Sequence, residues 1–530
     1  MEMRTWSSRA LRLACPIALV LVGMALMAGP SGAASSGAGG TLPALPDGLN
    51  VAIGAHVSAN SGSTPDTSLS NVNDGDGTTR WCPGTVGIHT VTIDLGRVVD
   101  VTGTGVTFSG EEGSDGSFYS VSTGVSSPGQ TSFPNQAAGD RNTIVQGPLY
   151  LFAGAAADTT ATVRARYVTL TYQVPREQNI CVQELRVFST NATTAPNLEL
   201  GADLSNLSSD PSTYTLDGQS ASPLDILKDG GGNDVRLRLL VNPSGCGSSC
   251  LNLANDLAVA SEARRDGMKI LLDIEYSDSS TSSSAQATPS GWAGQPLSTL
   301  AGTVRDYTRS VIRAFAANGT PVSQVAIGNE ITQGFLWPTG QLVFGRSHRA
   351  RWTGLTTLLK AAIAGAQAGN PARNPLGIDL DIDAGAENAT SADFFNHILA
   401  ARVPFDVIGE SYSPWLQGSM SALKANLDNL IARYRKPVVL AEGQFPYADV
   451  TGYGDYSTTV PYPDTLPGYL ISPEGQASYE RDLVSLMASL PRGFGLGLFY
   501  LAPDAMGSLG MFTSTGAAQP SVDSYRVGAR

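Results

Sequence analysis

The chain has 530 residues, and 33 lysines and arginines stand against 46 aspartates and glutamates, which gives a formal net charge of −13. This length predicts more than one domain, and 42% apolar with 15% charged residues is typical of a globular protein. The acidic balance argues against nucleic acid or an anionic membrane as the main partner. With five cysteines, four histidines and no Cys-x-x-Cys pair, a dedicated zinc site is not expected.

The first 34 residues have the features of a secretory signal peptide. Three arginines at positions 4, 9 and 12 precede an apolar run at 13–28, and small residues follow at 31–34. The run is shorter than the roughly 20 residues that a membrane-spanning helix needs. We therefore expect a secreted, extracellular protein without stable membrane association. A retained membrane anchor is the alternative.

The remaining cysteines predict disulfide bonds. Removal of residues 1–34 leaves Cys82, Cys181, Cys246 and Cys250, and an even number in an exported protein indicates two bridges. The simplest pairing joins Cys82 to Cys181 and Cys246 to Cys250. Three pairings are possible, and the sequence does not choose between them.

Residues 47–190 are predicted to form an all-β domain. Runs of alternating apolar and polar residues at 89–95, 101–108, 166–172 and 182–188 are separated by Gly, Ser and Asn. Alternation with β-branched residues is typical of half-buried strands, and the regular spacing is typical of a β-sandwich. We expect Trp81 to pack in its core. Residues 190–196 are expected to be a short linker.

From residue 197 to the end, short apolar runs alternate with Ala- and Leu-rich stretches of helical period. This rhythm indicates βα units around a parallel sheet, and eight repeats predict an α/β fold of the (β/α)8 TIM-barrel type over 197–530. An open doubly wound sheet is the alternative, but no glycine-rich dinucleotide turn follows the first strand. The expected strands are 198–205, 234–240, 269–276, 324–330, 377–383, 405–412, 437–443 and 495–503, and the expected helices include 253–266, 297–318, 352–368, 392–401, 420–434 and 474–489.

Two glutamates end expected barrel strands, where active sites of this fold lie. Strand four ends at Asn329 and Glu330, and strand seven at Glu442. Paired carboxyl groups can perform glycoside hydrolysis, one protonating the leaving oxygen and the other attacking the anomeric carbon. Asn329 is expected to bind a sugar 2-hydroxyl, and Arg236 or Arg238 to keep one carboxylate ionised. A lone glutamate at a strand end is more often salt-bridged or solvated, so the prediction depends on the pair.

An ordered set of motifs runs through the expected barrel. They are GADLS (201–205), VRLR (235–238), GMKILLD (267–273), YSD (276–278), IGNE (327–330), LWPTG (336–340), DAGAEN (383–388), FDVIG (405–409), AE (441–442), SPEGQ (472–476) and GLFY (497–500). In these motifs the chain resembles glycoside hydrolase family 53, the endo-β-1,4-galactanases of a retaining (β/α)8 clan. The resemblance implies that Glu330 is the acid/base, Glu442 the nucleophile and Arg236 the clan's strand-two arginine.

The resemblance also implies a polysaccharide partner, the galactan or arabinogalactan of plant cell walls, and no required cofactor. We expect a monomer. Aromatic residues just beyond strand ends either stack on sugar rings or pack in loops, and a Gly/Tyr/Pro insertion at 445–470 with tyrosines at 447, 453 and 456 is a candidate substrate wall. The predicted substrate-binding residues are Asn329, Arg236, Asp203, Asp273, Tyr276, Asp278, Trp337, Tyr412, Trp415 and Tyr500.

Three positions depart from the family pattern. Glu275 and Asp381 stand where the family usually has histidines, and Leu501 replaces a sugar-stacking tryptophan. Extra negative charge is expected to raise the pKa of the acid/base, and loss of the aromatic face to weaken sugar packing. Two alternatives follow: a related retaining glycosidase that acts on another β-linked polysaccharide, or a carbohydrate-binding relative without turnover.

The N-terminal region carries a second set of motifs, at 73–77 (NDGDG), 79–82 (TRWC), 91–96 (VTIDLG) and 182–188 (VQELRVF). They resemble the discoidin or coagulation-factor type C domain, which implies a galactose-binding-like jelly roll that docks on carbohydrate. The resemblance makes Asp74 and Asp76 candidate ligands of a structural Ca²⁺. The alternative is that the NDGDG motif is only a turn.

Overall fold

The computed structural model describes residues 48–65, 67–77, 79–109, 119–128, 131–132, 149–153, 163–174, 180–190, 198–205, 214–244, 250–342, 348–448, 465–466, 469–501, 503 and 507–527. The expected signal peptide, nearly all of the expected linker, Cys246 and the tyrosines at 453 and 456 lie outside these residues, so their predictions are untested. In the described part of the chain, no helix has the length and apolar character to cross a bilayer.

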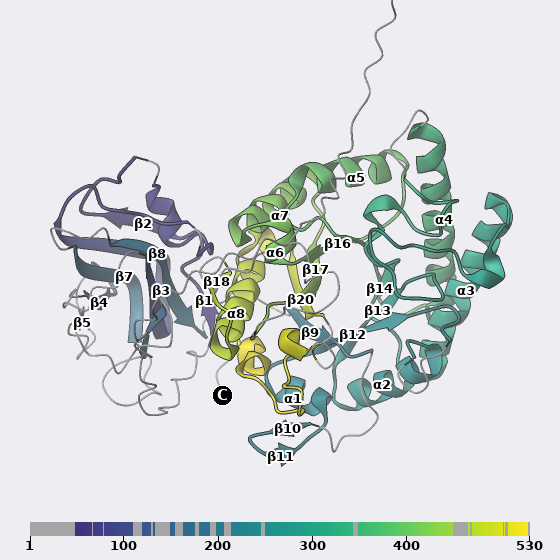
Figure 1. Cartoon of the computed structure of the whole chain (residues 1–530), viewed down its shortest axis with the longest axis horizontal. Helices are drawn as coiled ribbons and strands as arrows, with labels where there is room; N and C mark the ends of the chain where they lie inside the picture. Colours follow the sequence, from purple (N-terminus) through teal and green to yellow (C-terminus); the bar gives the residue numbers. More distant parts are fainter. Residues whose placement is uncertain are drawn as a thin grey trace, which may run out of the picture. The chain divides into compact units, whose positions relative to one another are not determined.

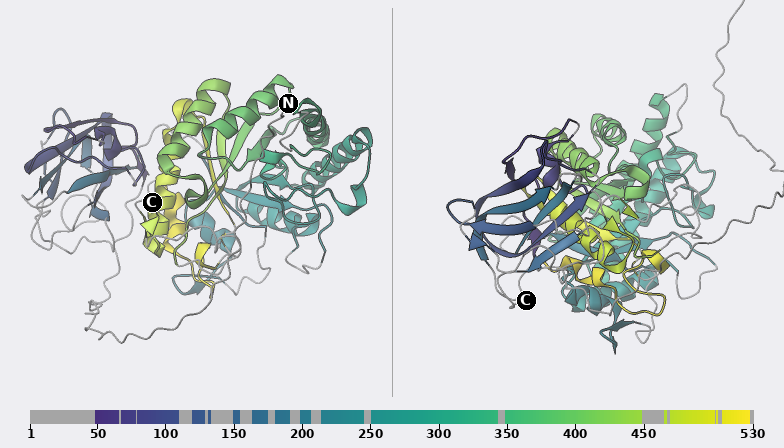
Figure 2. Two further views of the ribbon diagram at one scale, coloured as in Figure 1. Left: turned by 45° about the horizontal axis from the view of Figure 1, so that its top comes forward. Right: turned by 60° about the vertical axis from the view of Figure 1, so that its left-hand side comes forward.

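The N-terminal region is built from strands, and they pair antiparallel. One eight-stranded sheet has the path β1-β8-β3-β7-β4-β5, and β2 and β6 also pair with β3. Two packed sheets, as a sandwich requires, remain a prediction. The strands, which Figures 1 and 2 colour purple to blue, are β1 (Leu49–Asn50), β2 (His56–Ala59), β3 (Gly87–Ser109), β4 (Tyr119–Gly124), β5 (Thr131–Ser132), β6 (Leu149–Ala153), β7 (Val163–Val174) and β8 (Cys181–Ser189).

Strand β3 differs from the prediction because it joins two expected strands, 89–95 and 101–108, into one. Its pairing with β7 shifts register between Asp94 and Val99, and Gly96 in this interval has a φ of 72°. A bulge of this kind bends a strand without ending it, and glycine adopts the positive φ without strain. The turn-like residues at 96–100 therefore mark a bulge rather than a loop.

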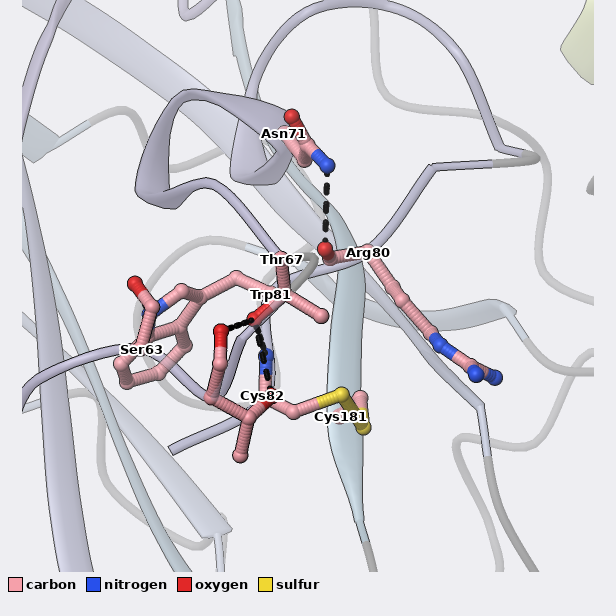
Figure 3. The surroundings of a disulfide bond; sticks show 8 residues. Ser63, Thr67, Asn71, Arg80, Trp81, Cys82 and Cys181 are labelled. Carbon is pink, nitrogen blue, oxygen red and sulfur yellow. Dashed lines mark hydrogen bonds between the residues drawn. A yellow bond between two sulfur atoms is a disulfide. The ribbon is translucent and has the colours of Figure 1, made fainter. Parts of the chain in front are cut away.

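Trp81 and the disulfide lie at the centre of the N-terminal core. The indole is fully buried, as predicted, and its Nε1–H donates to Ser63 Oγ at 2.9 Å. The next residue, Cys82, is bonded to Cys181 at the start of β8, which confirms the first predicted pair (Figure 3). The Thr67 hydroxyl accepts the Cys82 backbone N–H at 3.4 Å. The pairing of Cys246 with Cys250 stays a prediction.

The C-terminal region is a closed barrel of eight parallel strands, which confirms the predicted TIM barrel (Figure 1). The strand order is β9 (Glu199–Asp203), β12 (Asp234–Leu239), β13 (Lys269–Ile274), β14 (Gln324–Ile327), β15 (Gly377–Ile382), β16 (Val407–Tyr412), β17 (Val438–Gly443) and β20 (Gly495–Tyr500). Every strand falls within its expected range. Strands β13 and β14 end earlier than expected, because Tyr276 and Glu330 beyond them have left-handed φ values of 51° and 49°.

Helices surround the ring of strands in Figures 1 and 2, and the six expected ones are present. Sequence reasoning missed α1 and α6, which are too short for a helical period to show. The helices are α1 (Pro223–Asp229), α2 (Leu253–Arg265), α3 (Leu297–Ala317), α4 (His348–Gly369), α5 (Asn388–Ala400), α6 (Pro414–Gln417), α7 (Met420–Tyr434) and α8 (Pro473–Ser489). Small hairpins pair β10 (Thr215–Leu216) with β11 (Gln219–Ser220) and β18 (Thr465–Leu466) with β19 (Tyr469–Leu470), and 3-10 turns occupy Leu69–Val72, Ser290–Trp292, Ile331–Gln333, Pro491–Gly493, Gly507–Leu509 and Pro520–Tyr525.

The barrel strands change from apolar to polar toward their C-terminal ends. Leu271, Ala326, Val407, Val439 and Phe499 form a small apolar cluster separate from the main core. Side chains alternate along a strand, so Asp273, two residues beyond Leu271, shares its face. The polar ends are where a barrel of this fold builds its active site.

Candidate active site

Arg236 on β12 contacts four of the other predicted site residues. The side chain is fully buried, and its Nη2 lies 2.6 Å from Asp273 Oδ2, 2.8 Å from Glu442 Oε1 and 3.0 Å from Asn329 Oδ1. Its Nη1 lies 3.4 Å from Asp203 Oδ2. Since these partners come from β9, β13, β17 and the end of β14, one guanidinium fixes the relative positions of four other predicted residues.

The carboxyl groups around this guanidinium differ in pKa. Burial alone would raise the pKa of Asp203, but Arg238, whose Nε lies 2.5 Å from Asp203 Oδ2, and Arg236 hold that pKa below its usual value. Burial raises the pKa of Asp273 to about 6, although Arg236 opposes the shift. Asp203 is therefore the firmly ionised partner of the two arginines.

Glu330 stands just beyond β14 in a left-handed conformation, with φ 49° and ψ 49°. Its backbone N–H donates to Asp381 Oδ2 at 3.2 Å, and its Oε2 accepts the backbone N–H of Ser283 at 3.4 Å. Burial, and then the neighbouring charges of Glu442 and Asp383, raise the pKa of Glu330 well above its ordinary value. A carboxyl group that keeps its proton near neutral pH can act as a general acid.

Glu442 lies near the end of β17 and is 7% exposed. Its Oε1 faces Arg236, and its charge is the neighbouring charge with the largest effect on Glu330. The structure thus brings the two predicted glutamates into one electrostatic site. One carboxyl group is paired with a cation, and the other is set to hold a proton.

Sequence reasoning missed the loop between β13 and α3, which covers one side of Glu330. The Gln286 Nε2 donates to the Asn329 carbonyl at 2.6 Å and lies 3.4 Å from the Glu330 carbonyl. The Asn329 Nδ2 donates to the Thr281 carbonyl at 3.2 Å. These contacts fix the Asn329-Glu330 turn from outside the strands, and only the Ser/Thr-rich composition of residues 279–288 marked the loop in the sequence.

Glu275, one of the three departures, is buried and turned toward the same loop. Its Oε2 accepts the Thr281 backbone N–H at 2.5 Å and the Thr281 hydroxyl at 3.0 Å, and its Oε1 lies 3.7 Å from Arg238 Nη1. Burial raises its pKa to about 7, against the opposing charge of Arg238. The carboxyl group therefore anchors the loop to β13.

Three tyrosines predicted to bind substrate are buried, with their hydroxyl groups hydrogen-bonded inside the barrel domain. Tyr276 shares a hydrogen bond with Thr308 Oγ1 on α3 at 2.8 Å, and the Tyr412 hydroxyl donates to the Gly418 carbonyl at 2.8 Å. The Tyr500 hydroxyl donates to the Leu509 carbonyl at 2.6 Å. All three are at most 1% exposed, which favours packing roles over the predicted sugar contact.

The other predicted contacts are Asp278 and Trp337 in loops and Trp415 in α6. The Asp278 Oδ2 accepts the backbone N–H and hydroxyl of Ser290 at 2.8 and 2.7 Å, so it stabilises the β13–α3 loop. Trp415 is 9% exposed, whereas Trp337 is half-buried with its Nε1–H toward the Gln333 and Gly334 carbonyls. Trp337 is the more exposed of the two and stays a candidate for sugar stacking.

The carboxyl groups proposed for Ca²⁺ in the N-terminal region accept hydrogen bonds, Asp74 from its own turn and Asp76 from α7. Asp74 accepts the Asp76 backbone N–H and the Thr79 hydroxyl, each at 2.9 Å, and Asp76 Oδ2 accepts the Ser421 hydroxyl at 2.6 Å. Within the described ranges, no group of three or more His, Cys, Asp or Glu is arranged to hold a metal ion. Both carboxyl groups already accept hydrogen bonds, and a structural Ca²⁺ stays a prediction.

Comparison with known proteins identifies relatives of the barrel region. Residues 199–524 match the model of glycosyl hydrolase family 53. The probable arabinogalactan endo-beta-1,4-galactanase A of Aspergillus terreus is 34% identical over 314 residues, which cover 57% of this chain and 84% of the relative. The arabinogalactan endo-beta-1,4-galactanase A of Aspergillus niger is 30% identical over 313 residues, covering 57% and 84%.

Solved structures agree with this match. The GH53 catalytic domain of Ignisphaera aggregans superposes with a TM-score of 0.56 at 27% identity and covers 63% of this chain and 97% of that domain. A structure from a study of two fungal beta-1,4-galactanases superposes with a TM-score of 0.55 at 27% identity, covering 62% and 99%.

Proposed function

We propose a reaction for this chain on the premise that it belongs to glycosyl hydrolase family 53 and is therefore a glycoside hydrolase with a polysaccharide substrate. It hydrolyses β-1,4-galactosidic bonds within galactan or arabinogalactan, with retention of configuration. The proposal is supported by the names of the relatives and, above all, by the pairing of Glu442 with Arg236 beside the proton-holding Glu330.

Glu442 is the proposed nucleophile. Arg236 stabilises its ionised form, which can attack the anomeric carbon while Glu330 gives its proton to the leaving oxygen. The attack forms a glycosyl ester and removes the negative charge of Glu442. Because that charge raises the pKa of Glu330, esterification lowers this pKa and prepares Glu330 to take a proton from the attacking water.

Asn329 is the proposed contact to the sugar 2-hydroxyl. Its Oδ1 accepts from Arg236 and one Nδ2 proton is donated to Thr281. An amide nitrogen carries two protons, so one remains for the substrate. With both ends of the amide held, the donor is preorganised for the transition state.

The remaining assignments are also proposals. Residues 1–34 direct secretion to the extracellular space, and the N-terminal domain docks on carbohydrate, which would raise the local concentration of substrate by tethering. Glu275, Asp381 and Leu501 support a second candidate, a retaining glycosidase on another β-linked polysaccharide.

The test is product analysis on galactan, arabinogalactan and mannan with the wild type, Glu442→Gln, Glu330→Gln and, as an exposed control, Glu262→Gln. Galactan cleavage with a retained anomeric centre, seen by NMR, supports the first candidate. Each active-site variant is expected to lower kcat by about 10³-fold or more, with Glu262→Gln unchanged. Full turnover by either active-site variant would refute its role. Cleavage of mannan alone would support the second candidate, and sugar binding by calorimetry without turnover would indicate a binding protein.

A further inference from the structure

Asp381 is a buried carboxyl group that touches the proposed acid/base through the main chain. It lies on β15 and is fully buried. Its Oδ2 accepts the Glu330 N–H at 3.2 Å, whereas no described residue donates to its Oδ1. This carboxyl group takes no part in the proposed bond-making steps.

The hydrogen bond from the Glu330 N–H to Asp381 stabilises an uncommon backbone conformation of Glu330. Glu330 has a φ of 49°, and a non-glycine residue keeps this left-handed conformation only when its surroundings hold it. Among the described residues, the Glu330 side chain accepts one hydrogen bond, the long contact from the Ser283 N–H. Asp381 therefore fixes the point from which the Glu330 side chain extends toward the sugar.

The surroundings of Asp381 disfavour its ionised form. Burial raises the pKa of Asp381 well above its ordinary value, and the charges of Asp379 and Glu442 raise it further. On β16 a glycine, Gly409, faces this strand, and a Cβ there would lie 2.8 Å from Asp379 Oδ1. The titratable and charged groups around Asp381 are Asp379 on its own strand, Arg236 on β12, Asp273 on β13, Glu330 after β14 and Glu442 on β17.

We propose that Asp381 is a positioning residue for the acid/base: as a neutral carboxyl group it fixes the main chain of Glu330 without adding charge to the pocket. The inference rests on the proposed function, since it needs Glu330 to be the group that donates the proton. An ionised carboxylate at this position would increase the repulsion on Glu442 and Glu330, whereas a neutral one supplies the acceptor alone.

Asparagine and a protonated aspartate have nearly the same shape, and both accept a hydrogen bond, so Asp381→Asn is the decisive variant. It is expected to keep kcat on galactan within about threefold of the wild type. The alkaline limb of its kcat/KM profile should stay in place or move to higher pH. Asp381→Ala removes the acceptor and should lower kcat about tenfold or more with little change in KM, because misplacing a catalytic group slows chemistry.

Asp234→Asn is the matched control: the same change in a buried carboxyl group at the start of β12, which accepts the Val235 N–H and has no described contact with Asp381 or Glu330. It should change neither kcat nor the pH profile appreciably. Thermal melting identifies any variant that has lost its fold. If Asp381→Ala does not fold, the pH profile of Asp381→Asn still decides.

Either of two results with Asp381→Asn would overturn the inference: an alkaline limb displaced to lower pH by about one unit, which shows that the wild-type group is charged, or a loss of kcat as large as that of Asp381→Ala. The proposed function fails in a different way, through a wild type without galactanase activity or a Glu442→Gln variant with full turnover. An active wild type with unaffected Asp381→Ala rejects only the positioning role.

Discussion

The Nη2 of Arg236 lies 2.8 Å from Oε1 of Glu442, and the guanidinium is completely shielded from solvent. Burying a charge is costly unless it is paired, and here the cost is offset by contacts to Asp203, Asp273 and Asn329 as well. The arginine thus has a structural and an electrostatic role. Its replacement should therefore lower both the stability and the activity of the protein.

Replacement of Arg236 by methionine is the first test. It leaves buried carboxylates without their cation, so we expect the free energy of unfolding to fall by about 3–5 kcal/mol and kcat/KM to fall by about 10²-fold or more. Urea unfolding and steady-state kinetics measure both. The control is Arg305→Met, which breaks only an exposed pair with Asp306 and should leave the free energy of unfolding nearly unchanged. A folded, fully active Arg236→Met would contradict this account.

A second prediction concerns the pH dependence of stability through Glu480 on α8. Burial raises its pKa to about 8, and neither carboxyl oxygen has a hydrogen-bond partner among the described residues. An unfolded glutamate titrates near about 4.3. Because the folded chain holds this proton more tightly, the stabilising contribution is complete below about pH 4 and is lost as the pH rises through about 8.

Glu480→Gln should therefore flatten the dependence of the unfolding free energy on pH. Between pH 5 and 8 the wild type is expected to lose up to about 1.4 kcal/mol per pH unit more than the variant. Urea titrations at several pH values measure the difference, with exposed Glu262→Gln as control. Parallel curves for wild type and Glu480→Gln would show that Glu480 is not a buried acid in solution.

The sequence predicted the barrel well because its signals are local. Apolar runs alternating with helical stretches mark every strand, and the strand ends place Glu330 and Glu442 on one face without any knowledge of contacts. The N-terminal strands followed in the same way from their period of two. The break at Gly96 was misread, because a bulge and a turn use the same residues.

The sequence did not predict which polar groups are buried, because that depends on residues far apart in the chain. Tyr276, Tyr412 and Tyr500 follow the family motifs yet point their hydroxyl groups into the fold. Gln286 contacts the turn of Glu330 from a loop with no motif of its own. Burial and loop contacts of this kind arise only when the chain has closed into a barrel.

A third prediction concerns the ion pair between Arg186 on β8 and Asp482 on α8. The Arg186 Nε lies 2.6 Å from Asp482 Oδ2, both side chains are buried, and Tyr469 donates to the same oxygen at 2.7 Å. Arg186→Met should cost about 3–5 kcal/mol, because it leaves the Asp482 carboxylate buried without its cation. The double variant Arg186→Met/Asp482→Leu should recover most of this loss.

A double-mutant cycle in urea measures the coupling of the pair. Because the pair links a strand of the N-terminal sheet to a helix of the barrel, we also expect the wild type to unfold in one cooperative transition, followed by tryptophan fluorescence and circular dichroism together. Additive costs of the single changes, or two separate transitions, would contradict the coupling.

The last prediction separates sugar contact from packing among the predicted aromatic residues. The half-buried ring of Trp337 lies just beyond β14, whereas Tyr500 is fully buried and hydrogen-bonded to the main chain. Stacking on a ring is worth about 0.5–1.5 kcal/mol beyond the area buried, so Trp337→Ala should raise KM on galactan about three- to tenfold with a smaller change in kcat. Tyr500→Phe keeps the ring but leaves the Leu509 carbonyl without its donor, so it should lower the unfolding free energy by about 1–3 kcal/mol without raising KM. Kinetics and urea unfolding of both variants give the answer. A Tyr500→Phe variant with raised KM and wild-type stability would show that Tyr500 contacts the substrate after all. An unchanged KM for Trp337→Ala would show that Trp337 does not contact it.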